Sequence, residues 1–83
     1  MTIEFDYREW QSSSHKNGPR GYGSWCFSVG RDVQWQLDHE IRTGNLVIGP
    51  TYLWVNQATF SEAKRAARKI AQEHGWSKLY VQP

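Results

Sequence analysis

The sequence predicts a single α+β domain over residues 1–83, with one antiparallel sheet of three to five strands packed by one α-helix in the C-terminal half. Alternating apolar and polar residues in the first half predict strands, because successive side chains of a strand point to opposite faces. Alanines at three- and four-residue spacing near the C-terminus predict the helix. The expected order is strand, strand, strand, strand, helix and a short final strand.

The first predicted strand covers residues 3–8, where an isoleucine, a phenylalanine and a tyrosine alternate with charged residues. Trp10 follows on the polar side of this strand. Residues 11–23 have almost no apolar content and carry several turn-forming residues, so we expect a long loop there.

A hairpin is predicted next. Residues 24–29 alternate again and lead into Gly30-Arg31-Asp32, which can reverse the chain. Residues 33–41 show the cleanest alternation in the sequence. They are therefore predicted to form a third strand paired with the second.

The fourth predicted strand follows a turn at Thr43-Gly44-Asn45. It lies within the apolar stretch 46–55, which is interrupted by Gly49-Pro50. Proline cannot donate to a central ladder, so the strand should be bent or split at that point. The β-favouring residues 79–81 predict a short last strand.

The predicted helix spans residues 60–74. Thr59 and Glu62 have the spacing of a capping box, in which the two side chains satisfy amides left free at a helix start. Gly75 supplies a residue that readily takes the left-handed conformation found at many helix ends.

Composition favours a compact protein in the cytoplasm. The chain has 83 residues, of which 39% are hydrophobic, and a net charge of +2. It is too apolar for a disordered chain, and no segment reaches the roughly 18 apolar residues of a membrane span. Cys26 has no partner for an internal disulfide, and the first residues lack a signal-peptide pattern. We therefore expect a cytoplasmic domain without membrane contact or cofactor.

The sequence offers no activated set of catalytic residues. Cys26 lies in the middle of a predicted strand, between two serines. His39 lies between Asp38 and Glu40, but alternation places it on the opposite face of the strand from both carboxylates. We therefore expect a protein that is not an enzyme and holds no metal.

Positive charge concentrates in the predicted helix. Residues 1–58 carry five basic and six acidic side chains, whereas residues 59–83 carry five basic and two acidic ones. Four of the basic residues recur opposite the alanines, so all four are predicted to face solvent. They are Lys64, Arg65, Arg68 and Lys69. They form either an ordinary solvated helix face or a contact surface for a polyanion, which would be nucleic acid or an acidic protein surface.

The long loop supplies a second candidate contact region. Lys16 and Arg20 would add positive charge, and Trp10 or Tyr22, at the two ends of the loop, would supply an apolar anchor in solvent. The simpler alternative is a spacer loop with both aromatic residues folded back onto the sheet. Because five tryptophans are more than one small core easily hides, we expect one or two on the surface.

Residues 21–75 resemble the three-strand-plus-helix DNA-binding domains of plant ethylene-response factors and the arm-binding modules of tyrosine integrases. The likeness lies in strands at GSWCFSV and VQWQLDHEI and a helix at ATFSEAKRAARKIAQEHG, and the positions that match are Trp25, Val29, Phe60, Glu62 and Ala63. The resemblance implies DNA contacts from Trp25, Arg31 and Trp35 on the sheet. This sequence departs from the pattern by two carboxylates in the third strand, which would repel phosphates.

The whole chain is also similar in size and architecture to small single-domain inhibitors of phages and mobile elements, anti-CRISPR proteins in particular. The resemblance implies binding to a host protein or nucleoprotein complex, often where that complex would hold nucleic acid. We therefore expect an inhibitor that binds a host nucleic-acid-handling complex through the basic helix face and exposed aromatic residues. The alternative is a DNA- or RNA-binding domain of the three-strand-plus-helix type.

Overall fold

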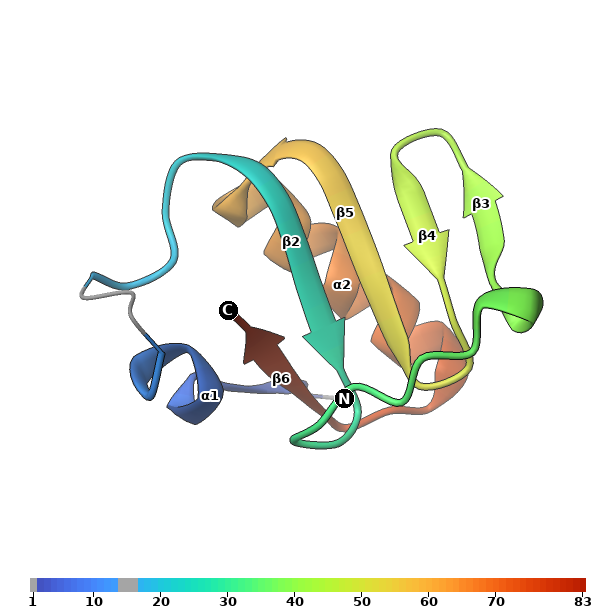
Figure 1. Ribbon diagram of the computed structural model, residues 1–83, viewed down its shortest axis with the longest axis horizontal. Coiled ribbons are helices and arrows are strands. Elements are labelled where there is room, and N and C mark those ends of the chain that lie inside the picture. Colours follow the sequence, from blue (N-terminus) through green and yellow to red (C-terminus); the bar gives the residue numbers. More distant parts are fainter. Residues whose placement is uncertain (1, 14–16) are drawn as a thin grey trace.

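The computed structural model, which describes residues 2–13 and 17–83, has an α+β fold. Figure 1 shows the sheet with helix α2 behind its two longest strands, β2 and β5. The predicted fold class, with a helix in the C-terminal half packed on a sheet, is confirmed. The elements, in chain order, are β1 (Glu4–Asp6), α1 (Arg8–Gln11), β2 (Tyr22–Ser28), η1 (Leu37–His39), β3 (Ile41–Thr43), β4 (Leu46–Ile48), β5 (Tyr52–Thr59), α2 (Phe60–His74) and β6 (Lys78–Gln82).

The sheet is mixed and has six strands within the described residues, so the prediction of an antiparallel sheet of three to five strands is wrong in these details. The strand order is β1-β6-β2-β5-β4-β3. The last strand, predicted at 79–81, exists as β6 and pairs parallel to β1 and antiparallel to β2. Since α2 carries the chain back across one sheet face, β6 enters beside β2 and presents its other edge to β1.

Residues 33–40 do not form the strand that their alternation predicts. Residues 33–36 have no regular structure, η1 follows them, and only residues 41–43 form a strand. Both edges of β2 are filled, one by β5 and the other by β6, so the segment after β2 finds no free edge beside it. It crosses instead to the far side of the sheet, where β3 forms the edge (Figure 1).

The apolar residues that alternate in and just after residues 33–40, which we call the crossover segment, lie in different surroundings. Trp35 folds onto the sheet face that α2 leaves uncovered, with its ring centroid 4.9 Å from that of Tyr52 and 6.0 Å from that of Trp54. Leu37 and Ile41 are 68% and 65% exposed. The alternating apolar residues therefore do not share one buried face.

The first strand is shorter than predicted, because Asp6 turns the chain into a helix. β1 ends at Asp6, whose carboxylate accepts a hydrogen bond of 2.9 Å from the backbone amide of Arg8. The short helix α1 begins at Arg8 and places Trp10 in the core. The prediction of a strand over residues 3–8, with Trp10 on its polar side, is therefore wrong beyond Asp6.

Hairpins join β3 to β4 and β4 to β5, whereas the hairpin predicted at Gly30-Arg31-Asp32 does not form, because β2 pairs with β5 and β6 instead. Gly44 and Asn45 connect β3 to β4, and Gly44 takes a positive φ of 58°, which glycine adopts without the steric penalty of a side chain. The apolar stretch 46–55 is split at Gly49-Pro50 into β4 and β5, which pair antiparallel. The prediction of a bent or split strand is confirmed as a split.

Helix α2 begins and ends where the sequence predicts. The Glu62 amide donates to Thr59 Oγ1 at 3.2 Å, and the Thr59 amide donates to Glu62 Oε1 at 2.9 Å, which completes the capping box. Gly75 ends the helix with φ 73°, and its amide and that of the next residue donate to carbonyls of the last turn. In residues 2–13 and 17–83, the helices are too short or too polar to span a membrane.

The core lies between α2 and the sheet. The buried face of the helix consists of Ala63, Ala67, Ile70 and Ala71. Opposite it, Phe27, Leu53, Leu79 and Val81 have no exposed surface. Near the start of α2, six aromatic rings contact one another with centroid distances of 5.0 to 6.3 Å, and we call them the aromatic cluster. They are Phe5, Tyr7, Trp10, Trp25, Phe27 and Phe60.

The Tyr52 ring packs directly against Gly49, so we predict that Gly49→Ala destabilises the protein. A Cβ at Gly49 would lie closer to the Tyr52 ring than van der Waals contact permits. That ring is fully buried and its hydroxyl donates to Glu40, so it has little room to move. Overpacking of this kind costs about 1–3 kcal/mol. Urea unfolding should show a loss of that size.

Gly23→Ala is the matched control, because a Cβ at Gly23 meets nothing within 4 Å and the residue lacks a positive φ. It should leave the free energy of unfolding unchanged or raise it slightly, by reducing the freedom of the unfolded chain. Equal effects of the two substitutions would mean that Gly49 does not lie beneath Tyr52.

Candidate functional site

Ion pairs are unevenly distributed over the part of the chain that the structure describes. Among the described residues, Arg8, Arg31, Arg42 and Lys78 form ion pairs with N–O distances of 2.6 to 3.5 Å. Within the same part of the chain, none of the basic residues of α2 forms an ion pair, and neither does Arg20. The unpaired residues of α2, which we call the cationic face, are Lys64, Arg65, Arg68 and Lys69.

One side of the cationic face covers aromatic rings. Lys64 Nζ lies 4.9 Å from the ring centroid of Phe5 and 5.7 Å from that of Tyr7, and the Arg68 guanidinium lies 5.5 Å from Phe5. A cation over a ring face is attracted by the ring quadrupole. Lys64 is consequently half-buried, whereas the other three residues are exposed. The prediction that all four face solvent is wrong for Lys64, because the aromatic side chains around β1 extend beneath this side of the helix.

The end of the long loop lies against the start of α2. The Phe60 amide donates to the Gly21 carbonyl at 3.0 Å, and Tyr22 is the register partner of Thr59. Tyr22 is 72% exposed, so the prediction that it stands in solvent is confirmed. Arg20 is also exposed. Lys16, the other predicted contact of this loop, lies outside the described residues.

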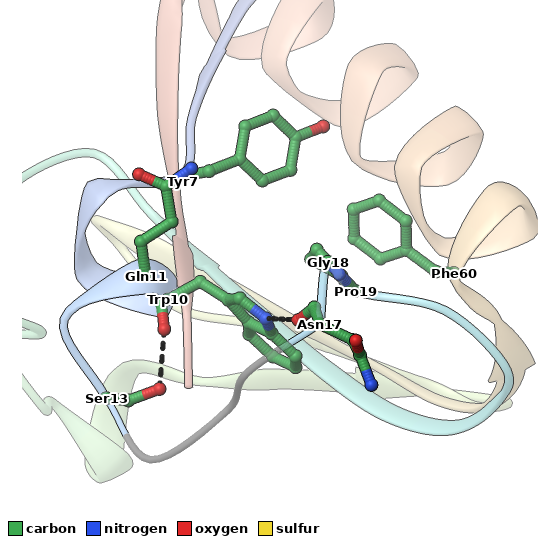
Figure 2. A pocket seen from close by; sticks show the side chains of 8 residues that line it. All are labelled: Tyr7, Trp10, Gln11, Ser13, Asn17, Gly18, Pro19 and Phe60. Atoms are coloured by element: carbon green, nitrogen blue, oxygen red, sulfur yellow. Dashed lines mark hydrogen bonds between the residues drawn. The ribbon is translucent and has the colours of Figure 1, made fainter.

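A hollow of about 670 Å³ lies between α1, the loop and the first residue of α2 (Figure 2). Tyr7, Trp10 and Phe60 give it aromatic walls, and Gln11 and Asn17 contribute polar side chains. We call this space the aromatic hollow. It lies beside the cationic face, because Tyr7 both lines it and packs beneath Lys64.

Trp10 belongs to the inner wall of this hollow and is only 9% exposed. Its indole N–H donates to the Asn17 carbonyl at 2.7 Å, and its ring centroid lies 5.8 Å from that of Trp25. The prediction of Trp10 as an anchor in solvent is therefore wrong, because the turn after Asp6 directs the ring inward. Tyr22, in contrast, is an exposed aromatic residue of this region.

The turn that positions Tyr7 and Trp10 depends on the Asp6 carboxylate. The carboxylate is almost fully buried and accepts hydrogen bonds from Arg8 Nε and Nη2 at 2.9 and 2.7 Å. Lys78 Nζ of β6 lies 3.2 Å from the same group. Hydrogen bonds from the Arg8 side chain and backbone, with a smaller effect of Lys78, hold the pKa of Asp6 well below its usual range. The charged form of Asp6 therefore ties β1, α1 and β6 together.

The cysteine and the His39 region, which we considered for catalysis and metal binding, do not line the aromatic hollow. Cys26 is buried, and burial raises the pKa of its thiol to about 12, so the thiolate needed for nucleophilic attack is scarce at neutral pH. His39 is exposed on η1, while Glu40 accepts hydrogen bonds from Arg42 and Tyr52. In residues 2–13 and 17–83, no three His, Cys, Asp or Glu side chains are placed to hold a metal ion.

The three residues that the DNA-binding resemblance implies do not lie together. Trp25 is buried in the aromatic cluster, where its indole N–H donates to the Ala58 carbonyl at 2.9 Å. Arg31 pairs with Glu9 at 2.6 Å. Trp35 is 53% exposed in the crossover segment, and it confirms the expectation of a tryptophan on the surface.

Sequence reasoning missed the aromatic hollow. The alternation places Tyr7 on a core-facing strand position, and composition places Gln11 and Asn17 in a loop, with no indication that they surround one space. The available signal is Asp6, since aspartate readily accepts a hydrogen bond from a backbone amide two residues later and thereby competes with strand geometry.

Comparison with models of protein families, with curated proteins and with solved structures finds no match. The candidate site is therefore defined by its own side chains. It comprises the cationic face, the adjoining Arg20 and Tyr22, and the aromatic hollow beside them.

The Asp6 network predicts a specific loss of stability in acid. An aspartate whose pKa is lowered by folding stabilises the folded state above its unfolded pKa of about 3.9, and this contribution disappears as the pH falls below that value. Asp6→Asn should therefore be less stable than wild type at pH 7. The difference between their urea midpoints should shrink steadily between pH 5 and pH 2.

Asp32→Asn provides the control, because Asp32 is an exposed carboxylate without an ion pair in the described residues. It should keep the acid dependence of the wild type. A constant difference between wild type and Asp6→Asn across this pH range would show that the charge of Asp6 does not hold the turn.

Proposed function

We propose that this protein is a non-catalytic binding protein that attaches to a polyanionic partner through the cationic face, Arg20 and Tyr22. Its most concrete form is an inhibitor of the anti-CRISPR type that binds a host nucleic-acid-handling complex. The observation that carries the proposal is the unequal pairing of charge: carboxylates neutralise Arg8, Arg31, Arg42 and Lys78, while the cations of α2 stay unpaired among the described residues.

The cationic face carries repulsion that an anionic partner would relieve. Lys64 and Arg68 are four residues apart, and so are Arg65 and Lys69. Like charges at this spacing destabilise a helix by about 0.2–0.5 kcal/mol per pair. Glu62, the acidic residue nearest to them in the sequence, accepts hydrogen bonds from Thr59 in the capping box, and these hydrogen bonds lower its pKa more than the charge of Arg65 does. Phosphates or carboxylates of a partner would attract these cations and offset the repulsion between them.

Tyr22 gives the surface an apolar contact as well as charge. It is 72% exposed and lies one residue beyond Gly21, whose carbonyl is bonded to the start of α2. Tyrosine and arginine are the residue types that most often dominate binding energy in protein interfaces. Tyr22, Arg65 and Arg68 would therefore contribute most to a protein contact.

A second candidate function is direct binding of nucleic acid, without a protein partner. It is favoured by the aromatic hollow, which lies beside the cationic face and presents rings and carboxamides together. A phosphate backbone attracts unpaired cations strongly, and its affinity falls steeply with salt.

The proposal predicts that removing three charges from the cationic face weakens polyanion binding. Replacing Arg65, Arg68 and Lys69 by glutamine keeps good helix formers at exposed positions, so the fold should survive. It lowers the net charge from +2 to −1. Affinity for heparin should fall by at least about tenfold, or about 1.4 kcal/mol. Elution from immobilised heparin along a salt gradient measures this change.

A control with the same net charge isolates the position of the charge. Gln34→Glu, Gln36→Glu and Thr43→Glu alter exposed residues of β3 and of the segment before it and also bring the charge to −1. This variant should elute close to wild type. Identical early elution of both variants would contradict the proposal, because binding would then follow net charge alone.

The same proteins test the inhibitor form in a host whose CRISPR system restricts a phage. Wild type and the control variant should restore plaque formation, and the neutralised variant should not. Equal plaque counts with and without wild-type protein would contradict inhibition while leaving polyanion binding intact.

A further inference from the structure

We infer that the aromatic hollow binds an unstacked base of a single-stranded nucleic acid, while Lys64, Arg68 and Arg20 contact the phosphates on either side. The inference rests on the proposed function and names the ligand class of the same surface. Three properties of the hollow support it. The hollow has ring surfaces, it has carboxamides without a hydrogen-bond partner among the described residues, and it has cations on its border but no acidic residue in its described lining.

The ring surfaces suit stacking. Tyr7 and Trp10 line the hollow from α1 and its N-cap, Phe60 lines it from the start of α2, and Tyr7 and Phe60 meet edge to face at 6.3 Å (Figure 2). Trp10 is 9% exposed and its indole N–H is bonded to the Asn17 carbonyl, so it forms the inner wall, and Tyr7 and Phe60 are the rings against which a base would stack. Aromatic side chains bind bases of any sequence, because every base has a π-face.

The carboxamides suit hydrogen bonding to base edges. The side chains of Gln11 and Asn17 line the hollow, are exposed, and have no hydrogen-bond partner within residues 2–13 and 17–83. Each presents one acceptor and two donors, the combination that pairs with the mixed donors and acceptors of a base edge. Bases splayed out of a single strand expose their Watson–Crick edges, which base pairing occupies in a duplex.

The charge around the hollow suits phosphates. Lys64 lies over Tyr7, one of the walls, and Arg68 lies one turn further along α2. Arg20 follows Pro19, which lines the hollow from the other side. An acidic peptide would also pair with these cations, but its carboxylates would neither stack on the rings nor offer the carboxamides both donors and acceptors. A volume of about 670 Å³ falls within the usual range for ligand sites.

Fluorescence anisotropy with labelled oligonucleotides tests the inference. The probes are an RNA and a DNA single strand of about 12 nucleotides, the matching duplexes, and the free mononucleotide as competitor. Wild type should bind one of the single strands at least about tenfold more tightly than its duplex. The mononucleotide should compete weakly, because it lacks the neighbouring phosphates. Comparison of the two single strands shows whether RNA or DNA is the source of the base.

Two sets of variants separate the hollow from the cationic face. Gln11→Ala with Asn17→Ala should weaken single-strand binding at least about tenfold without changing its salt dependence. Gln34→Ala with Gln72→Ala removes two exposed carboxamides elsewhere and should bind as wild type does. The Arg65, Arg68 and Lys69 to glutamine variant should lower the slope of log affinity against log salt by about 0.7 for each phosphate that the protein no longer neutralises. Circular dichroism should show equal folding of all variants.

Each failure has a distinct meaning. If the Gln11 and Asn17 variant binds single strands as wild type does, or if duplex binds equally well, the hollow does not hold a base and the inference is wrong. If wild type binds no single strand but still binds heparin and restores plaques, the partner is an acidic protein surface, and the proposed function stands without this inference. Failure of wild type itself to bind heparin would overturn the proposed function.

Discussion

Strand β6 determines the arrangement of the other elements, because it occupies the edge of β2 that a local hairpin would otherwise take. Phe27 of β2 faces Val81 across this pairing, and both are completely buried. Gln82 adds two hydrogen bonds of 2.7 Å, to Ser28 Oγ and to the Arg31 carbonyl, which hold the chain as it leaves β2. With β5 on the opposite edge, the following segment must cross to the far side of the sheet before it can form β3.

The same strand builds the candidate site. Its free edge receives β1 in parallel, and Lys78 joins Arg8 in holding the Asp6 carboxylate where β1 turns into α1. Because α1 packs against β6, Trp10 is drawn into the aromatic cluster, and the rings around β1 extend beneath one side of α2. The aromatic hollow and its neighbouring cations therefore arise from the docking of the N-terminal segment on the C-terminal strand.

Local signals in the sequence are sufficient for the elements that depend on local interactions. The capping box, Gly75, the turn at Gly44 and the break at Gly49-Pro50 each act over a few residues, and the prediction of each is confirmed. The alternation at 33–40 predicts a strand that does not form, because β6, which is distant in the sequence, pairs with the edge of β2 that this strand would need. The basic residues of α2 are predictable from their spacing, whereas the hollow depends on contacts between segments as far apart as Tyr7 and Phe60.

Amide hydrogen exchange followed by NMR tests this account most directly, because slow exchange marks backbone amides that are hydrogen-bonded inside the sheet. If β6 is the neighbour of β2, amides at residues 79–81 should exchange about as slowly as those at 26–28, and amides at 33–35 should exchange rapidly. Slow exchange at alternate residues of 33–41, together with rapid exchange at 78–82, would show that the crossover segment occupies the place beside β2 and would contradict the account.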